Sequence, residues 1–228
     1  MVKMTFIGHS CFLLDNGKHK ILIDPFIKGN PVAKTTDAVK KPDFILISHG
    51  HGDHLGDAIE IARASDAMVI SNNEIATYCG TKGVKRFHPL HIGGGNKFDF
   101  GSLKLTIAHH GSSLGDNYQY GGSPAGFIIR IDGKIIYHAG DTGLFLDMKL
   151  IGELDKIDVA LLPIGGNFTM DVGDAVKAVE FLHPQKAIPM HYNTFDLVAA
   201  DPREFINKIK SLGVEGIILK PGETYELN

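Results

Sequence analysis

Short runs of hydrophobic residues along the chain predict a series of β-strands. Apolar and β-branched runs bounded by polar segments are typical of strands. Asn16-Gly17 separates two early runs, and this dipeptide is a strong signal for a tight hairpin turn. The chain is therefore expected to open as an antiparallel meander. The predicted strands cover residues 4–7, 11–14, 20–23, 44–47, 67–70, 103–107, 127–129, 134–137, 159–162 and 186–190.

Apolar residues at helical spacing predict helices between several of these strands. Leu55, Ile59 and Ala62 recur at the period of one helix face. Asp201-Pro202 supplies an N-cap residue followed by a first-turn proline. Helices are expected after residue 54, at 174–182 and at 204–212. The pattern predicts two layers of sheet with helices outside.

Composition narrows the class of protein. The chain has 228 residues, of which 43% are hydrophobic, so it can support one large core and a single domain over 1–228. Its formal net charge of −3 gives no basic surface of the kind that binds a phosphate backbone, which disfavours nucleic acid as a partner. The two cysteines, Cys11 and Cys79, need no disulfide. No signal peptide or membrane-length apolar run occurs, and a cytoplasmic location with no membrane partner is expected.

A cluster of metal-ligand residues follows the apolar run 44–47. His49, His51, Asp53 and His54 fall within six residues, and Gly50 and Gly52 allow the chain to turn tightly between them. Imidazole nitrogens and a carboxylate oxygen are ligands for divalent transition metals. This stretch therefore predicts a metal site, against the alternative of a polar surface loop.

Polar residues also follow four other predicted strands. The pairs His109-His110 and His138 with Asp141 come directly after two of them, and Asn167 and His191 come after two more. Because strand ends that share one rim of a fold bring their following loops together, we expect these groups to converge.

The order of these motifs resembles the metallo-β-lactamase superfamily. The resemblance rests on His49-Gly50-His51-Gly52-Asp53-His54, His110, Ala139-Gly140-Asp141-Thr142 and His191. Gly8-His9-Ser10-Cys11-Phe12, the segment 163–170 and the segment 189–194 look like the small single-domain metal-dependent hydrolases related to the ascorbate-phosphate lactonases. The resemblance implies an α/β (α+β) fold, a four-layer αβ/βα sandwich of two mixed sheets with helices outside and a dinuclear metal centre in the cleft.

The resemblance also implies the ligands of two divalent ions. His49, His51 and His110 would hold the first ion, Asp53, His54 and His191 the second, and Asp141 would bridge them. His109 remains the alternative to His110, because strand alternation does not decide between adjacent residues where a strand ends. Zinc is the expected metal, and manganese, iron and nickel tolerate the same ligands.

The implied activity is hydrolysis by a metal-bound hydroxide of a small, anionic ester, lactone or phosphodiester. Asp53 would orient the hydroxide and exchange its proton. His9 is a candidate for substrate binding or proton delivery, His138 for orienting a ligand and Asn167 for a substrate contact. The alternatives are a metal-dependent ribonuclease or phosphodiesterase of the same superfamily and a non-hydrolytic di-iron redox protein. A homo-oligomer is compatible with the resemblance.

Overall fold

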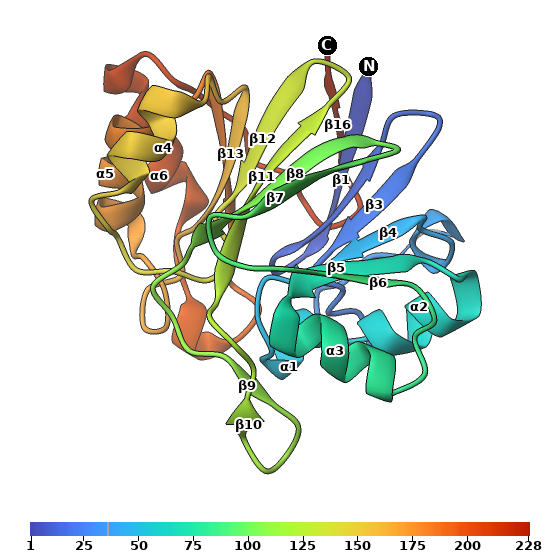
Figure 1. Ribbon diagram of the computed structural model, residues 1–228. Helices are drawn as coiled ribbons and strands as arrows, with labels where there is room; N and C mark the ends of the chain where they lie inside the picture. The colour runs from blue at the N-terminus through green and yellow to red at the C-terminus, as the bar shows by residue number, and fades with distance from the viewer. Residues whose placement is uncertain (36) are drawn as a thin grey trace.

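Two mixed β-sheets face each other, and helices cover their outer faces (Figure 1). The computed structural model describes residues 1–35 and 37–228, with the side chain of Ala38 also left undescribed. This is the four-layer αβ/βα sandwich that the sequence predicted. Within the described residues, no helix has the length and apolar character needed to cross a membrane.

The first sheet combines an antiparallel half with a parallel half. The predicted hairpin is present: β2 and β3 pair antiparallel, and the Asn16 Oδ1 atom accepts hydrogen bonds from the backbone N–H groups of Lys18 and His19 in the turn. From β3 onward the strands are parallel. In spatial order the strands are β16 (Thr224–Leu227), β1 (Val2–Gly8), β2 (Cys11–Asp15), β3 (Lys20–Ile23), β4 (Phe44–Leu46), β5 (Met68–Asn72) and β6 (Phe87–Leu90).

The second sheet is built in the same way, with parallel strands on the side that the last helices cover. Its spatial order is β15 (Glu215–Gly216), β14 (Lys186–Met190), β13 (Val159–Pro163), β12 (Lys134–His138), β11 (Ala125–Ile131), β8 (Gly101–Ile107) and β7 (Gly95–Phe98). A short hairpin of β9 (Ser113–Leu114) and β10 (Gln119–Tyr120) projects from the body of the molecule (Figure 1).

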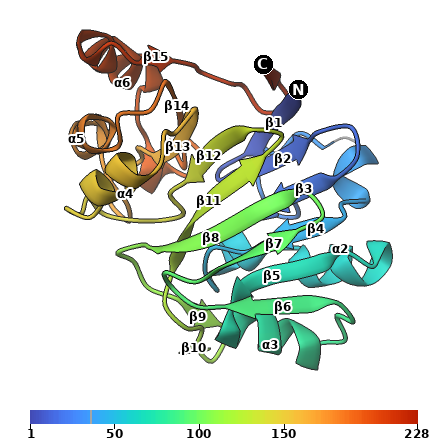
Figure 2. The ribbon, with the colours of Figure 1, turned by 45° about the horizontal axis from the view of Figure 1, so that its top comes forward.

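The helices divide between the two sheets. The early helices lie against the first sheet and the late helices against the second (Figure 2). The helices are α1 (Gly52–Leu55), α2 (Ala58–Ser65), α3 (Asn73–Thr81), α4 (Met148–Leu154), α5 (Val172–Leu182) and α6 (Pro202–Ile209), with 3-10 turns η1 (Asp37–Lys40), η2 (Asp196–Val198) and η3 (Lys210–Leu212). The predicted helix 204–212 therefore starts at Pro202 and changes to a 3-10 turn after Ile209.

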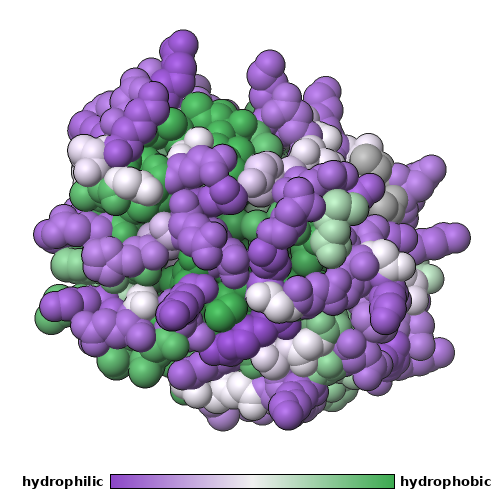
Figure 3. Space-filling model, turned by 90° about the horizontal axis from the view of Figure 1, so that it is seen from above, coloured by the Kyte–Doolittle hydropathy of each residue, from purple (hydrophilic) through white to green (hydrophobic). Residues whose placement is uncertain are grey.

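The alternation of strand side chains produces two cores. Phe12 and Leu14 face the second sheet, whereas Leu13 between them packs toward the helices α2 and α3. Seen from the end that carries both termini, hydrophilic side chains project from most of the surface, and hydrophobic side chains are visible between them (Figure 3).

The sequence patterns missed the edges of both sheets and two helices. The strands β6, β7, β15 and β16 lie at or next to sheet edges, where side chains are half-exposed and carry little hydrophobic signal. Helix α3 depends on its cap, because the Asn72 side chain accepts a hydrogen bond from the backbone N–H of Ile75. Helix α4 was also missed, since only Met148 of its residues is fully buried.

Candidate metal centre

Three histidines form one side of the centre. His49 and His51 lie on the loop that joins β4 to α1, and His110 follows β8 of the other sheet. The His49 Nε2 and His51 Nδ1 atoms are 3.0 Å apart, and the His110 ring lies 5.0 Å and 5.1 Å from their ring centroids. Burial lowers the pKa of all three rings, which favours the neutral form that binds a metal.

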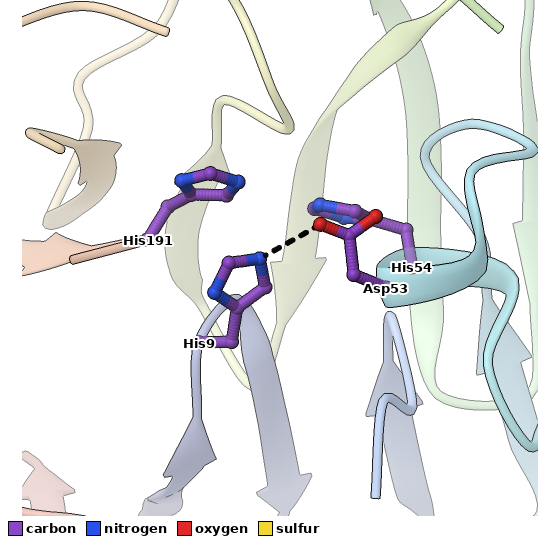
Figure 4. A group of neighbouring side chains, drawn as sticks. All are labelled: His9, Asp53, His54 and His191. Carbon is purple, nitrogen blue, oxygen red and sulfur yellow. Dashed lines mark hydrogen bonds and ion pairs between the residues drawn. The ribbon is translucent and has the colours of Figure 1, made fainter. Parts of the chain in front are cut away.

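A second group faces the first and consists of His9, Asp53, His54 and His191 (Figure 4). Asp53 and His54 lie on α1, His191 follows β14, and His9 lies in the turn between β1 and β2. One nitrogen or oxygen from each residue lies within 4.8 Å of the others. The four side chains thus come from three separate parts of the chain and point toward one another.

Asp141 lies between the two groups. Its Oδ1 atom is 3.2 Å from His54 Nε2, and its Oδ2 atom is 2.9 Å from His191 Nε2 and 3.6 Å from His110 Nε2. Burial by itself would raise the pKa of this carboxyl, but the fields of His54 and His191 outweigh it and hold the pKa well below its usual range. A buried, ionised carboxylate in this position can bridge two cations.

Buried atoms without hydrogen bonds indicate that the site is built for a metal. Among the described residues, His54 Nε2, Asp141 Oδ1 and His191 Nδ1 are buried and make no hydrogen bond. Such atoms are costly unless something else satisfies them. Imidazole nitrogens beside a carboxylate oxygen fit a divalent transition metal.

His54 is held by a buried pair of residues that the sequence analysis missed. Asp24, directly after β3, accepts hydrogen bonds from the Ser48 backbone N–H at 2.7 Å and the Ser48 hydroxyl at 2.6 Å, and its Oδ2 atom lies 2.8 Å from His54 Nδ1. Because Asp24 contacts the Nδ1 atom of His54, the Nε2 atom points toward Asp141. A cation could bind His54 there in place of the proton on Nε2. Burial alone would lower the pKa of His54, but Asp141 and Asp24 raise it well above the usual value. The position of Asp24 at a strand end was the available sequence signal.

His9 connects Asp53 to the loop after β14. Its Nε2 atom lies 3.2 Å from Asp53 Oδ2, and its Nδ1 atom lies 2.8 Å from the hydroxyl of Thr194, a residue that the sequence analysis also missed. Burial lowers the pKa of His9 to about 4, so the ring is neutral. Because a carboxylate only accepts, His9 donates from Nε2 and its Nδ1 atom accepts from Thr194. Burial tends to raise the pKa of Asp53, but the hydrogen bond from His9 and the field of His54 outweigh it, and the net shift is downward.

The remaining predicted residues lie outside the two groups. His109 is exposed and stacks on Phe145 at 4.9 Å between ring centroids, so the structure brings His110 and not His109 into the centre. His138 is buried with both ring nitrogens bonded to backbone, one at 3.0 Å from the Ser10 carbonyl oxygen and one at 3.1 Å from the Gly140 N–H. Its ring can therefore position the chain beside Asp141 but is not free to contact a substrate. Asn167 is exposed and has a left-handed backbone, with φ of 49°.

Two glycines let the ligand loops approach their neighbours. A Cβ atom on Gly50 would lie 2.6 Å from the carbonyl oxygen of Ser113, and one on Gly140 would overlap the carbonyl oxygen of Ala125. Gly140 also has a positive φ of 62°, which favours glycine directly before Asp141. The close approach of both loops thus depends on the absence of a side chain.

Comparisons with known proteins agree with this architecture. A family model described as a beta-lactamase superfamily domain matches residues 3–191. The UPF0173 metal-dependent hydrolase of Pelotomaculum thermopropionicum is 52% identical over 230 residues, which cover 99% of this chain and 100% of the relative. A UPF0173 metal-dependent hydrolase of Bacillus velezensis is 49% identical over 230 residues, with 99% and 100% covered.

Solved structures give the same result. Igni18, a metallo hydrolase from the archaeon Ignicoccus hospitalis, superposes with a TM-score of 0.90 at 44% identity and covers 100% of this chain and 99% of its own. The superfamily resemblance that the sequence motifs indicated is thereby confirmed. The chain belongs to the β-lactamase superfamily and is a metal-dependent hydrolase of the UPF0173 group.

Proposed function

We propose that the protein hydrolyses a small, anionic ester, lactone or phosphodiester with the help of two divalent cations, most simply zinc. The observation that carries the proposal is the position of Asp141 between two groups of ligands. His49, His51 and His110 lie on one side of it, and Asp53, His54 and His191 on the other. In such a site, a pair of divalent ions supplies an acidified water molecule and stabilises the negative charge that develops on the substrate.

Asp53 is the residue best placed to handle the proton. Its side chain is 32% exposed, whereas His54 and Asp141 are nearly closed to solvent. The bond from His9 fixes Oδ2. Among the described residues, Oδ1 has no hydrogen-bond partner, and it can accept a proton from water and return it to a leaving group.

The charge of the site favours an anionic substrate. Two carboxylates, Asp53 and Asp141, against two divalent cations leave a positive centre inside a chain whose formal net charge is −3. A small anion is drawn to the centre, whereas the net negative charge of the chain disfavours binding of a long polyanion. This charge distribution supports a small-molecule substrate over a nucleic acid.

The test is a hydrolysis screen with the intact chain. Phosphodiesters, lactones, thioesters and β-lactams are offered after chelation, and zinc, manganese, iron(II) or nickel is added back singly. We expect metal-restored turnover on one class, and its loss in the folded variants Asp141→Ala and His51→Ala. The matched control is His91→Ala, which removes an exposed histidine outside the centre and should leave turnover unchanged. Full activity of Asp141→Ala would refute the assigned centre.

A further inference from the structure

The loop that follows β14 is braced so that it holds one shape. The Asn193 side chain donates to the Ala200 carbonyl oxygen at 3.0 Å and accepts from the Ala200 N–H at 2.9 Å, while the Asn193 N–H donates to the Val198 carbonyl oxygen at 2.8 Å. At its start, the His191 N–H donates to the His9 carbonyl oxygen at 2.8 Å. His191 and Asn193 both have φ of 54°, a conformation kept only where surrounding contacts enforce it.

This loop presents a phenyl ring beside the metal centre. Phe195 follows Thr194, whose hydroxyl is bonded to His9, and the ring centroid of Phe195 lies 5.8 Å from that of His9. Phe26, from the loop after β3, also lies 5.8 Å from His9 and 6.2 Å from Phe195. The two phenyl rings thus lie beside each other and against the buried ring of His9, and we call this pair the Phe26–Phe195 wall. His9 links this wall to Asp53, because its ring hydrogen-bonds both to Thr194, the neighbour of Phe195, and to Asp53.

The exposure of Phe195 is larger than shielding His9 requires. His9 is already closed to solvent, with 1% of its surface exposed, yet 42% of Phe195 remains exposed. A rigid loop that keeps an aromatic ring half in water beside a charged centre loses the free energy that burial would supply, unless a ligand covers the ring. Ligand sites combine apolar walls with a few polar groups in this way.

We propose that the Phe26–Phe195 wall binds an apolar group of the substrate, so that the substrate is an anion carrying an aryl or branched alkyl substituent next to the bond that is hydrolysed. This inference rests on the proposed hydrolase function and narrows its substrate class. The cationic centre takes the anionic group, and the wall takes the apolar substituent on the Asp53 side. An aromatic substituent would gain further from edge-to-face contact with the phenyl rings.

The kinetic test uses two substrates that differ only in the substituent. The 2,2,2-trifluoroethyl monoesters of methylphosphonic acid and phenylphosphonic acid share an anionic phosphorus centre and a leaving group that is not aromatic, and the matching ester pair serves if the screen identifies esters. We expect Phe195→Ala to lower kcat/KM for the phenyl substrate about 10-fold and to change the methyl substrate less than about 2-fold. For the phenyl substrate, the kcat/KM of Phe195→Leu should lie between that of Phe195→Ala and that of the parent chain.

Phe87→Ala is the matched control. Phe87 is 40% exposed, close to the exposure of Phe195, but it starts β6 at the far edge of the first sheet. Removal of the Phe87 ring should leave the ratio of the kcat/KM values for the two substrates unchanged. If Phe195→Ala reduces both substrates equally, the wall only shields His9 and Asp53, and the inference is wrong.

A binding readout separates this inference from the proposed hydrolysis. The chain contains no tryptophan, so Phe195→Trp introduces a single indole reporter into the wall. We expect phenylphosphonate, which is not hydrolysed, to change the fluorescence of this variant at a concentration at least about 10-fold lower than methylphosphonate does. Equal responses would overturn the inference even if hydrolysis is found. If no substrate is turned over but phenylphosphonate is preferred, the wall stands and the proposed hydrolysis fails.

Discussion

At the scale of single residues, the orientation of the ligands depends on side chains that themselves bind no metal. His138 is fully buried at the end of β12, and its two ring nitrogens tie the Ser10 carbonyl oxygen to the Gly140 N–H, directly before Asp141. Because Nδ1 accepts the N–H of Gly140, the ring must be neutral. Burial lowers the pKa of His138, in agreement with this arrangement.

The neutral state of His138 predicts how stability depends on pH. In the unfolded chain a histidine takes up a proton near pH 6.5, whereas the folded protein resists it, so the contribution of His138 is complete above about 6.5 and is lost as the pH falls below it. We expect the free energy of unfolding of metal-free protein to fall between pH 7.5 and pH 5.5, and to fall less in His138→Asn. Urea unfolding at the two pH values measures this. His91→Ala should keep the parent pH dependence, and an unchanged slope in His138→Asn would contradict the assignment.

At the scale of elements, the loops that follow β13 and β14 fix each other. Gly165 lies after β13, and a Cβ atom there would overlap the carbonyl oxygen of His191 and lie 2.9 Å from Cβ of Val198. The backbone of His191 is thus seated against a glycine on one side and against His9 on the other. Because β12, β13 and β14 pair in parallel, their register places His191, after β14, beside Asp141, after β12.

This contact predicts that Gly165→Ala displaces His191. We expect the variant to lose about 1–3 kcal/mol of stability and to bind fewer than two equivalents of metal, because an overpacked backbone contact must shift one loop. Thermal unfolding and metal analysis of dialysed protein give the two quantities. Gly143→Ala is the control, since it lies two residues after Asp141 but a Cβ atom there meets nothing within 4 Å. Parent-like metal content in Gly165→Ala would show that the loop pair is not rigid.

At the scale of the whole molecule, the candidate centre joins the two sheets. His49, His51, Asp53 and His54 follow β4 of the first sheet, whereas His110, Asp141 and His191 follow β8, β12 and β14 of the second. Cations held between them would connect the two halves directly, in addition to the apolar core that both sheets share. Metal binding should then contribute to global stability.

We expect chelation to lower the midpoint of thermal unfolding and metal to restore it. A cation at about 100 times its Kd adds about 2.7 kcal/mol to the free energy of unfolding for each site that only the folded chain provides. Calorimetry with chelator and with each cation measures the shift. Asp141→Asn should lose most of the metal-dependent shift in the unfolding midpoint, whereas His91→Ala should retain it. No shift with any cation would argue against a metal between the sheets.

The sequence by itself determined the central strands, the hairpin at Asn16-Gly17 and the residues expected to bind metal. These features are local: a buried strand needs a continuous apolar run, and a metal ligand must be one of a few residue types at a characteristic spacing. The same reasoning failed at sheet edges such as β7 and β16, where half-exposed strands depend on a neighbour rather than on their own composition.

Only the tertiary structure decided which groups meet. It separated His110 from the adjacent His109, brought Asp24 onto His54 and Thr194 onto His9, and placed Phe26 and Phe195 side by side. These contacts join residues far apart in the chain, and an orienting residue needs only one hydrogen-bonding atom or one ring within reach. Many residue types satisfy that condition, so it leaves no pattern in the sequence, and the packing of the two sheets selects the residue that fulfils it.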